Sequence, residues 1–166
     1  MTNWAQARGS WWVDEAPKKD GVIWHRGDFY GDCQLAFDTS QLASGPRSIR
    51  LILNGDGENA ASGYSLLVAR QSASDTSAVA QIQVAARVER EAKFPLEDAK
   101  VIRFARRGRF VLGYVDERCV IGFYDRSQQP QTGIHAGIQT SGAPLDLNKV
   151  YAQSDNSYDT TFHRAP

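Results

Sequence analysis

The most constraining feature of this sequence is a regular alternation of apolar and polar residues between Lys100 and Asp125. Short apolar runs joined by tight polar turns are typical of antiparallel strands connected as a meander. The runs are Val101–Arg106, Phe110–Val115 and Cys119–Tyr124. The alternation predicts one apolar face, made of Ile102, Phe104, Phe110, Leu112, Tyr114, Cys119, Ile121 and Phe123. Because a sheet must bury such a face against another layer, the pattern predicts a β-sandwich.

The rest of the chain supplies strands for the second sheet. Apolar residues alternate again in segments 33–37, 48–53, 64–70 and 134–139, which are separated by glycine-rich or polar turns. Residues 79–91 give one longer alternation, and their β-branched valines favour a strand over a helix. We expect about eleven strands and no helix. The predicted fold class is therefore all-β, an antiparallel β-sandwich built from residues 1–166 as a single domain.

Composition limits the partners that such a domain would bind. The chain has 19 basic and 19 acidic residues, so its net charge does not indicate a nucleic acid or an acidic membrane surface. Seven arginines lie between Arg87 and Arg118, which we interpret as a solvated sheet face. No apolar run is long enough for a transmembrane segment, and no export signal precedes the first strand. We expect a soluble, monomeric domain, extracellular or in the envelope if it is excised from a longer protein.

The cysteines, histidines and tryptophans indicate less about fold and function than the alternating runs do. Cys33 and Cys119 each fall on the apolar side of an expected strand, which favours buried free thiols over a disulfide. Zinc is not indicated, because His25, His135 and His163 are scattered and have no ligand spacing. The four tryptophans all lie within the first 24 residues. They form either a cap on one end of the sandwich, which we favour, or a platform on which sugars stack.

Three stretches of the chain resemble one superfamily. They are Trp12–Phe37, which contains Gly27-Asp28-Phe29, then Gly63–Val68, and finally Arg106–Gly137 with its Asp116-Glu117 turn. This combination resembles the concanavalin A-like lectin and glucanase jelly roll. More loosely, it is similar to laminin-G-like and 3-keto-disaccharide hydrolase-like domains of bacterial extracellular and envelope proteins. The resemblance implies two curved antiparallel sheets, with a glycan or polysaccharide bound on the concave sheet or at one rim.

Catalytic chemistry has little support in the sequence. Retaining hydrolysis of a glycoside needs two carboxylates about 5 Å apart on one face of a strand. The nearest candidate is the pair Glu89 and Glu91, which alternation places on one face, but neighbouring basic residues favour ion pairing instead. No serine has the Gly-x-Ser-x-Gly setting of a nucleophile. We therefore expect a module without catalysis of its own.

A glycine-punctuated loop carries the candidate metal ligands. Asn54, Asp56 and Glu58 offer the hard oxygen atoms that calcium prefers. The spacing differs from that of an EF-hand, and Asn-Gly and Asp-Gly pairs also form ordinary hairpin turns. Calcium is thus the one cofactor considered, and a tight hairpin is the alternative interpretation.

Sugar recognition requires planar hydrogen-bonding groups beside an aromatic ring on a rigid surface. Six residues opposite the expected apolar faces meet this description: Arg50, Gln83, Arg87, Arg118, Tyr124 and His135. They would converge if their strands shared the concave sheet. The sequence therefore predicts a lectin-like module. Two alternatives stay open, a hydrolase or lyase acting on modified disaccharides and a structural, protein-interaction module of an envelope protein.

Overall fold

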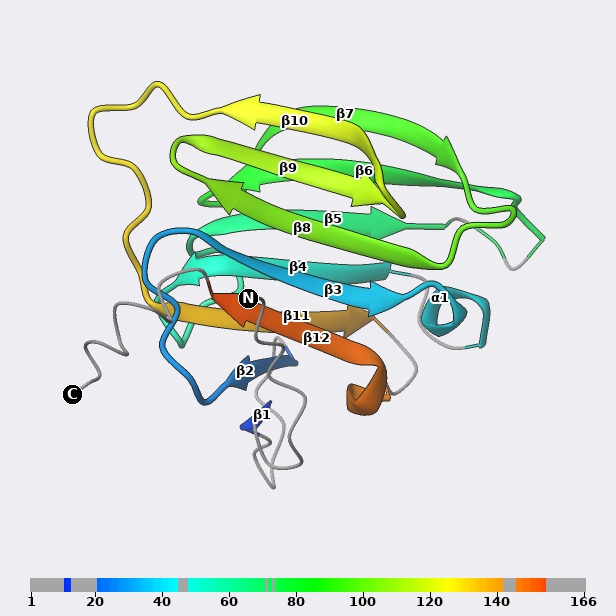
Figure 1. Cartoon of the computed structure of the whole chain (residues 1–166), viewed down its shortest axis with the longest axis horizontal. Coiled ribbons are helices and arrows are strands. Elements are labelled where there is room, and N and C mark those ends of the chain that lie inside the picture. The colour runs from blue at the N-terminus through cyan, green and yellow to red at the C-terminus, as the bar shows by residue number, and fades with distance from the viewer. Residues whose placement is uncertain are drawn as a thin grey trace.

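The computed structural model describes residues 11–12, 21–44, 48–70, 72, 74–141 and 146–154. These residues form two antiparallel sheets that pack face to face, as the overlapping layers of Figure 1 show. The expectation of an all-β sandwich is confirmed. One short α-helix and one 3-10 helix interrupt the strands of the described chain. Neither of these helices is long and apolar enough to cross a membrane.

The strands of each sheet come from distant parts of the chain. The seven-stranded sheet has the order β1 (Trp11–Trp12), β2 (Val22–His25), β11 (His135–Ser141), β4 (Ser48–Gly55), β5 (Tyr64–Ala69), β6 (Ser77–Val84) and β7 (Arg87–Pro95). The five-stranded sheet has the order β10 (Arg118–Tyr124), β9 (Phe110–Val115), β8 (Val101–Arg107), β3 (Cys33–Asp38) and β12 (Val150–Ser154). The helices are α1 (Ser40–Ser44) and η1 (Leu147–Lys149).

The core lies between the inner faces of the two sheets. Its fully buried side chains include Phe37, Leu51, Leu66, Ile82 and Phe104, which come from both layers. Burying an apolar side chain of this size stabilises the fold by roughly 2 kcal/mol. Alternation along each strand then places the intervening residues on the two outer faces of the sandwich.

The expected apolar face of the meander is wrong for β9. Val111, Gly113 and Val115 face the core there, whereas Phe110, Leu112 and Tyr114 face outward. Every residue of this strand except the glycine is apolar or aromatic, so alternation alone did not decide between the two faces. Packing decides it, because Ile121 fills the space above Gly113: a Cβ on Gly113 would lie 2.6 Å from Ile121 Cγ2.

A β-bulge in β10 changes the position of Cys119. Cys119 pairs with Tyr114, but Ile121 pairs with Gly113, so Val120 is an extra residue between them. Cys119 consequently faces outward and is exposed, which corrects the expectation that it is buried. Cys33 is buried, and both cysteines are free thiols, as expected.

The long strand expected over residues 79–91 is instead a tight hairpin between β6 and β7. Ala85 and Ala86 form its turn with φ angles of 48° and 71°. Two positive φ angles define a type I′ turn, which usually carries Asn-Gly. Because this turn carries Ala-Ala instead, the sequence gives no signal for it. A continuous alternation over residues 79–91 predicts Ile82, Val84, Ala86 and Val88 on the core side, but the turn leaves Ala86 and Val88 exposed.

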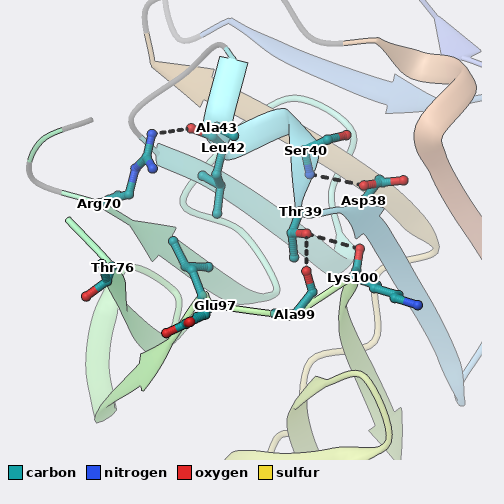
Figure 2. Close-up of a pocket in the computed structure, with 11 residues that line it drawn as sticks. Asp38, Thr39, Ser40, Leu42, Ala43, Arg70, Thr76, Glu97, Ala99 and Lys100 are labelled. Atoms are coloured by element: carbon teal, nitrogen blue, oxygen red, sulfur yellow. Dashed lines mark hydrogen bonds between the residues drawn. The ribbon is translucent and has the colours of Figure 1, made fainter. Parts of the chain in front are cut away.

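Helix α1 lies at one end of the sandwich, beside a hollow of about 710 Å³ (Figure 2). Thr39 Oγ1 donates a hydrogen bond to the carbonyl of Ala99 at 2.7 Å, and Arg70 Nη2 donates to the carbonyl of Leu42 at 2.7 Å. Hydrogen bonds from Ser40 hold the pKa of Asp38 below its usual range. These polar groups serve to attach the helix to the two sheets.

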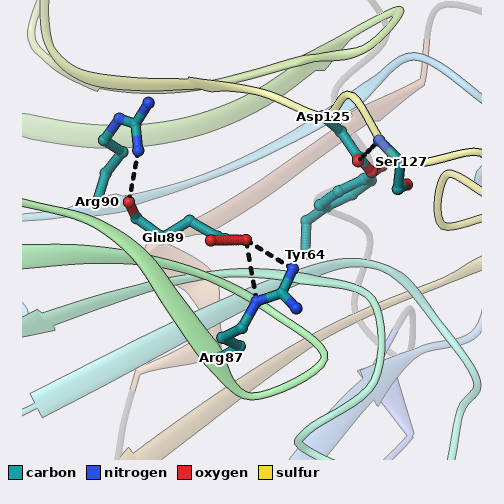
Figure 3. A network of polar contacts seen from close by, with 6 residues as sticks. All are labelled: Tyr64, Arg87, Glu89, Arg90, Asp125 and Ser127. Carbon is teal, nitrogen blue, oxygen red and sulfur yellow. Dashed lines mark hydrogen bonds and ion pairs between the residues drawn. The ribbon is translucent and has the colours of Figure 1, made fainter.

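Buried polar contacts hold the connection from β10 to β11 at the other end. The Tyr64 hydroxyl donates to Asp125 Oδ2 at 2.5 Å, as Figure 3 shows, and accepts from the amide of Gln131 at 3.1 Å. Arg106 Nη1 donates to the carbonyl of Gln131 at 2.7 Å. Arg106 is only 9% exposed, so it departs from the expected solvated arginine face. The crossover between the sheets is thus fixed by hydrogen bonds as well as by packing.

We predict that replacing the hairpin turn by Asn-Gly stabilises the protein. An alanine with positive φ costs roughly 1 kcal/mol, and glycine removes this cost. The double substitution Ala85→Asn with Ala86→Gly should raise the melting temperature by about 3 °C. As a control, Ala92→Gly in β7, where φ is not positive, should lower it. An unchanged or lower melting temperature in the double variant would contradict the turn geometry.

We also predict an alkaline loss of stability that depends on Tyr64. Burial, and next the hydrogen bond to Asp125, raises the pKa of Tyr64 to about 12. The folded state therefore holds this proton more tightly than the unfolded state, so stability falls as pH rises above about 10. By pH 11 the loss should be about 1 kcal/mol larger in the parent protein than in Tyr64→Phe. Urea unfolding from pH 8 to pH 11 measures this difference, and parallel profiles would refute it.

Candidate functional site

A row of hydrogen-bonded polar side chains crosses the outer face of the seven-stranded sheet. We call it the polar ladder, and it consists of Gln139 on β11, Arg50 on β4, Gln83 and Gln81 on β6, and Glu91 on β7. Their neighbours in sequence, such as Leu51, Ile82 and Ile138, are buried in the core. Alternation therefore directs the ladder away from the second sheet.

The hydrogen bonds of the polar ladder start from Arg50, which donates to a glutamine on each side. Arg50 Nε donates to Gln139 Oε1 at 3.1 Å, and Arg50 Nη1 donates to Gln83 Oε1 at 2.8 Å. The amide of Gln83 donates in turn to Gln81 Oε1 at 3.1 Å, and that of Gln81 donates to Glu91 Oε2 at 2.7 Å. The ladder thus connects a cation to an anion through two oriented amides, which restrains the rotamers of all of them.

Arg50 is the central group of this arrangement. It is half-buried, and burial lowers the pKa of its guanidinium below the ordinary value. An arginine remains protonated at neutral pH even after such a shift. Two of its five N–H donors are used by the glutamine oxygens, so further donors remain for an acceptor that approaches the face.

Trp24 covers the outer face at the β2 and β11 side of the ladder. Its indole lies against Gly137, where a Cβ would be 2.6 Å from Trp24 Cε3, and it also reaches Gly55. Trp24 is 8% exposed and forms an edge contact with His135, with 6.4 Å between ring centroids. Trp24 therefore packs on the backbone as a cap rather than as an open stacking platform. The side chains of the other three tryptophans lie outside the described residues.

The six residues expected to form the sugar site do not converge. Arg50 and Gln83 are in direct contact within the polar ladder, and His135 lies on the same sheet at the start of β11. Arg118 and Tyr124 belong to β10 of the other sheet. The condition for convergence, one shared sheet, is thus met by only part of the set.

Arg87 lies at the hairpin edge rather than in the polar ladder. Its side chain is 74% exposed, and its Nη2 pairs with Glu89 Oε2 at 2.8 Å (Figure 3). Glu89 is the extra residue of a second bulge, because Ile82 pairs with Arg90 and Gln83 pairs with Val88. The bulge therefore breaks the regular spacing between Glu89 and Glu91. The expected ion pairing is confirmed for Glu89.

Sequence inspection alone did not select three members of the ladder, Gln139, Gln81 and Glu91, as site residues. Alternation marks each of them as an outward residue. What the sequence lacked was a signal for the hairpin at Ala85-Ala86, which brings Glu91 opposite Gln81. The members of the polar ladder are therefore identified by which residues lie opposite one another on neighbouring strands, and not by their residue type.

The glycine-rich loop after β4 is organised by Asp56. Its Oδ1 accepts from the amides of Glu58 and Asn59, each at 2.8 Å, and its Oδ2 accepts from Asn59 Nδ2 at 2.9 Å. Burial raises the pKa of Asp56, but hydrogen bonds from Asn59, Glu58 and Ser62 outweigh it and leave a value of about 2. A carboxylate that accepts hydrogen bonds from amides of its own loop is typical of a tight polar turn.

The other two expected calcium ligands contribute differently. Asn54 is buried and donates from Nδ2 to the carbonyl of Gly133 at 3.1 Å, while its Oδ1 has no partner in the described part of the chain. Glu58 is exposed. A hollow of about 580 Å³ lies between this loop and residues 128–133. Within the described ranges, no three His, Cys, Asp or Glu residues gather as metal ligands. Calcium at Asn54, Asp56 and Glu58 stays a prediction.

Comparison with known proteins identifies the fold. No protein-family model and no curated protein sequence matches the chain. Among solved structures, it is similar to the carbohydrate-binding module CBM66 from Bacillus subtilis, with 17% sequence identity and a TM-score of 0.52 over 93% of this chain and 94% of that chain. It is also similar to the apo Crh5 transglycosylase, with 11% identity and a TM-score of 0.53 over 92% and 83% of the two chains. The chain therefore has the concanavalin A-like jelly-roll fold that its sequence resembles.

Proposed function

We propose that residues 1–166 are a single, non-catalytic carbohydrate-recognition domain that binds glycan at the polar ladder. The observation that carries this proposal is the position of Arg50, held between Gln139 and Gln83 on the outer face of a sheet. A guanidinium restrained in this way binds an oxygen acceptor with little further loss of side-chain entropy. Similarity in fold to a carbohydrate-binding module supports the same class of ligand.

The chemistry of the ladder suits sugar hydroxyl groups. A hydroxyl both donates and accepts hydrogen bonds, and the ladder presents guanidinium donors, amides and one carboxylate within a few strands. The flat, hydrogen-bonded sheet keeps these groups at fixed spacing. The ladder therefore fits a run of hydroxyl groups along a glycan better than a single small ion.

The absence of catalysis is inferred from the side chains of β6 and β7. Retaining hydrolysis requires two carboxylates about 5 Å apart. Gln81 and Gln83 contribute amides to the outer face, Glu91 is the one carboxylate of the ladder, and Glu89 is paired with Arg87 at the edge. This arrangement supports recognition over the alternative of a hydrolase or lyase acting on modified disaccharides. A structural, protein-interaction module of an envelope protein is the remaining alternative.

A glycan array with the purified protein, in the presence and absence of calcium, tests the proposal. We expect a bound glycan whose affinity falls about 30-fold in Arg50→Met, which keeps the apolar stem but removes a charged hydrogen-bonding group worth about 2 kcal/mol. Gln81→Ala should weaken binding by a smaller factor. The control Lys100→Gln, a charge loss at an exposed residue outside the ladder, should bind as the parent protein does.

The outcomes separate the three candidate functions. Binding to no glycan in either condition would refute recognition and favour the structural module. Release of shortened glycan products would refute the absence of catalysis. A requirement for calcium would direct attention to Asp56 and Glu58 in the rim loop.

A further inference from the structure

The outer face of the five-stranded sheet carries an exposed aromatic pair. Phe110 begins β9 and Tyr124 ends β10, and the two residues are direct partners in the strand register. Their side chains are 50% and 39% exposed, and their rings meet edge to face with 4.7 Å between centroids. Contiguous exposed apolar surface marks an interaction site more often than a single exposed ring does.

Arginine side chains lie over the aromatic residues of this face. The Arg126 guanidinium carbon is 5.8 Å from the centroid of the Tyr124 ring, and that of Arg103 is 4.1 Å from the centroid of the Tyr114 ring. Tyr114 faces outward on β9, in the same row as Phe110. We call Phe110, Tyr124 and Arg126 the stacking patch, with Arg103 and Tyr114 as its neighbours along the hairpin.

The charge of this patch is positive. Arg126 is exposed, and neither Arg126 nor Arg103 forms an ion pair with any residue that the structure describes. The nearest carboxylate in sequence, Asp125, is 3% exposed and accepts its hydrogen bond from Tyr64 inside the molecule. Asp116 and Glu117 lie at the opposite end of the hairpin, about 17 Å along the strands. Asp32 lies at the turn before β9, where its Oδ1 accepts from the amide of Gly108 at 2.7 Å, and it forms no ion pair with Arg126 among the described residues. The charge of Arg126 therefore adjoins the aromatic pair, whereas that of Arg103 lies further along β9 at Tyr114.

The hairpin also leaves room beside the aromatic pair. Gly122 is exposed on β10 and pairs with Leu112, so no side chain stands between Tyr124 and the bulge at Cys119. Leu112 is half-buried there. The surface next to Tyr124 is thus an apolar strip without a protruding side chain at Gly122, and Arg126 lies at its Tyr124 end.

We propose that the stacking patch binds an acidic polysaccharide, a sugar chain carrying carboxylate or sulfate groups. The apolar C–H face of a pyranose ring stacks on Phe110 and Tyr124, and an anionic group beside it pairs with Arg126. A second anionic group further along the sugar chain pairs with Arg103, which lies over Tyr114 about 13 Å along β9 from Phe110. Charge complementarity favours this occupant over a neutral glycan, and the exposed aromatic pair favours it over a free anion. The patch lies on the opposite side of the sandwich from the polar ladder, so it is independent of the function proposed for that face.

Isothermal titration of the full chain with polygalacturonate and with dextran sulfate tests the proposal, with neutral dextran as the uncharged polymer. We expect both acidic polymers to bind and dextran not to bind. Tyr124→Ala and Phe110→Ala should each weaken binding about fivefold, because an aromatic contact is worth roughly 1 kcal/mol. Arg126→Gln should reduce the dependence of the affinity on salt, since it removes one of the interacting charges. Lys100→Gln removes one exposed charge elsewhere and serves as the matched control.

Specific results would overturn the proposal. Equal binding of an aspartate-rich peptide would assign the patch to acidic protein partners instead of sugar chains. Loss of acidic-polymer binding in Arg50→Met, with unchanged binding in Tyr124→Ala, would move the site to the polar ladder. Circular dichroism of each variant establishes that the fold is retained, so a lost signal reports on the patch.

Discussion

The structure depends on burying the inner faces of two sheets against each other. Each strand contributes every second residue to this common core, so the choice of inner residues also determines every residue on the two outer faces. Next to Cys119 and at Glu89, a β-bulge adds one residue and interrupts the alternation of inner and outer residues. The polar ladder and the stacking patch are both consequences of that single geometric constraint.

The two outer faces use arginine in different ways. On the seven-stranded sheet, Arg50 is fixed by hydrogen bonds to two glutamines and is partly withdrawn from solvent. On the five-stranded sheet, Arg103 and Arg126 lie over tyrosine rings. The first arrangement offers directional donors, whereas the second offers charge beside an apolar surface. A chain with no net charge can therefore present two chemically distinct surfaces on one sandwich.

Much of the fold could be predicted from the sequence, because alternating runs such as Ile49, Leu51 and Leu53 can bury one face only as strands. The candidate site was harder to predict from the sequence than the fold. Arg50 and Gln83 were expected to be close and are in contact. Arg118 and Tyr124 had the same residue chemistry but belong to the other sheet. Residue type identified outward polar groups, but it carried no information on which sheet each strand would join.

The sequence by itself determined most of the strand-forming segments and the sandwich architecture, because these follow from local periodicity and the cost of burying polar groups. Only the tertiary structure decided which face of β9 is buried, where the Ala85-Ala86 turn folds the chain back, and which side chains meet Arg50. The physical reason is that these choices depend on packing and pairing between strands, such as Ile121 above Gly113 in one hairpin and Arg50 with Gln83 across the sheet, which no local pattern encodes.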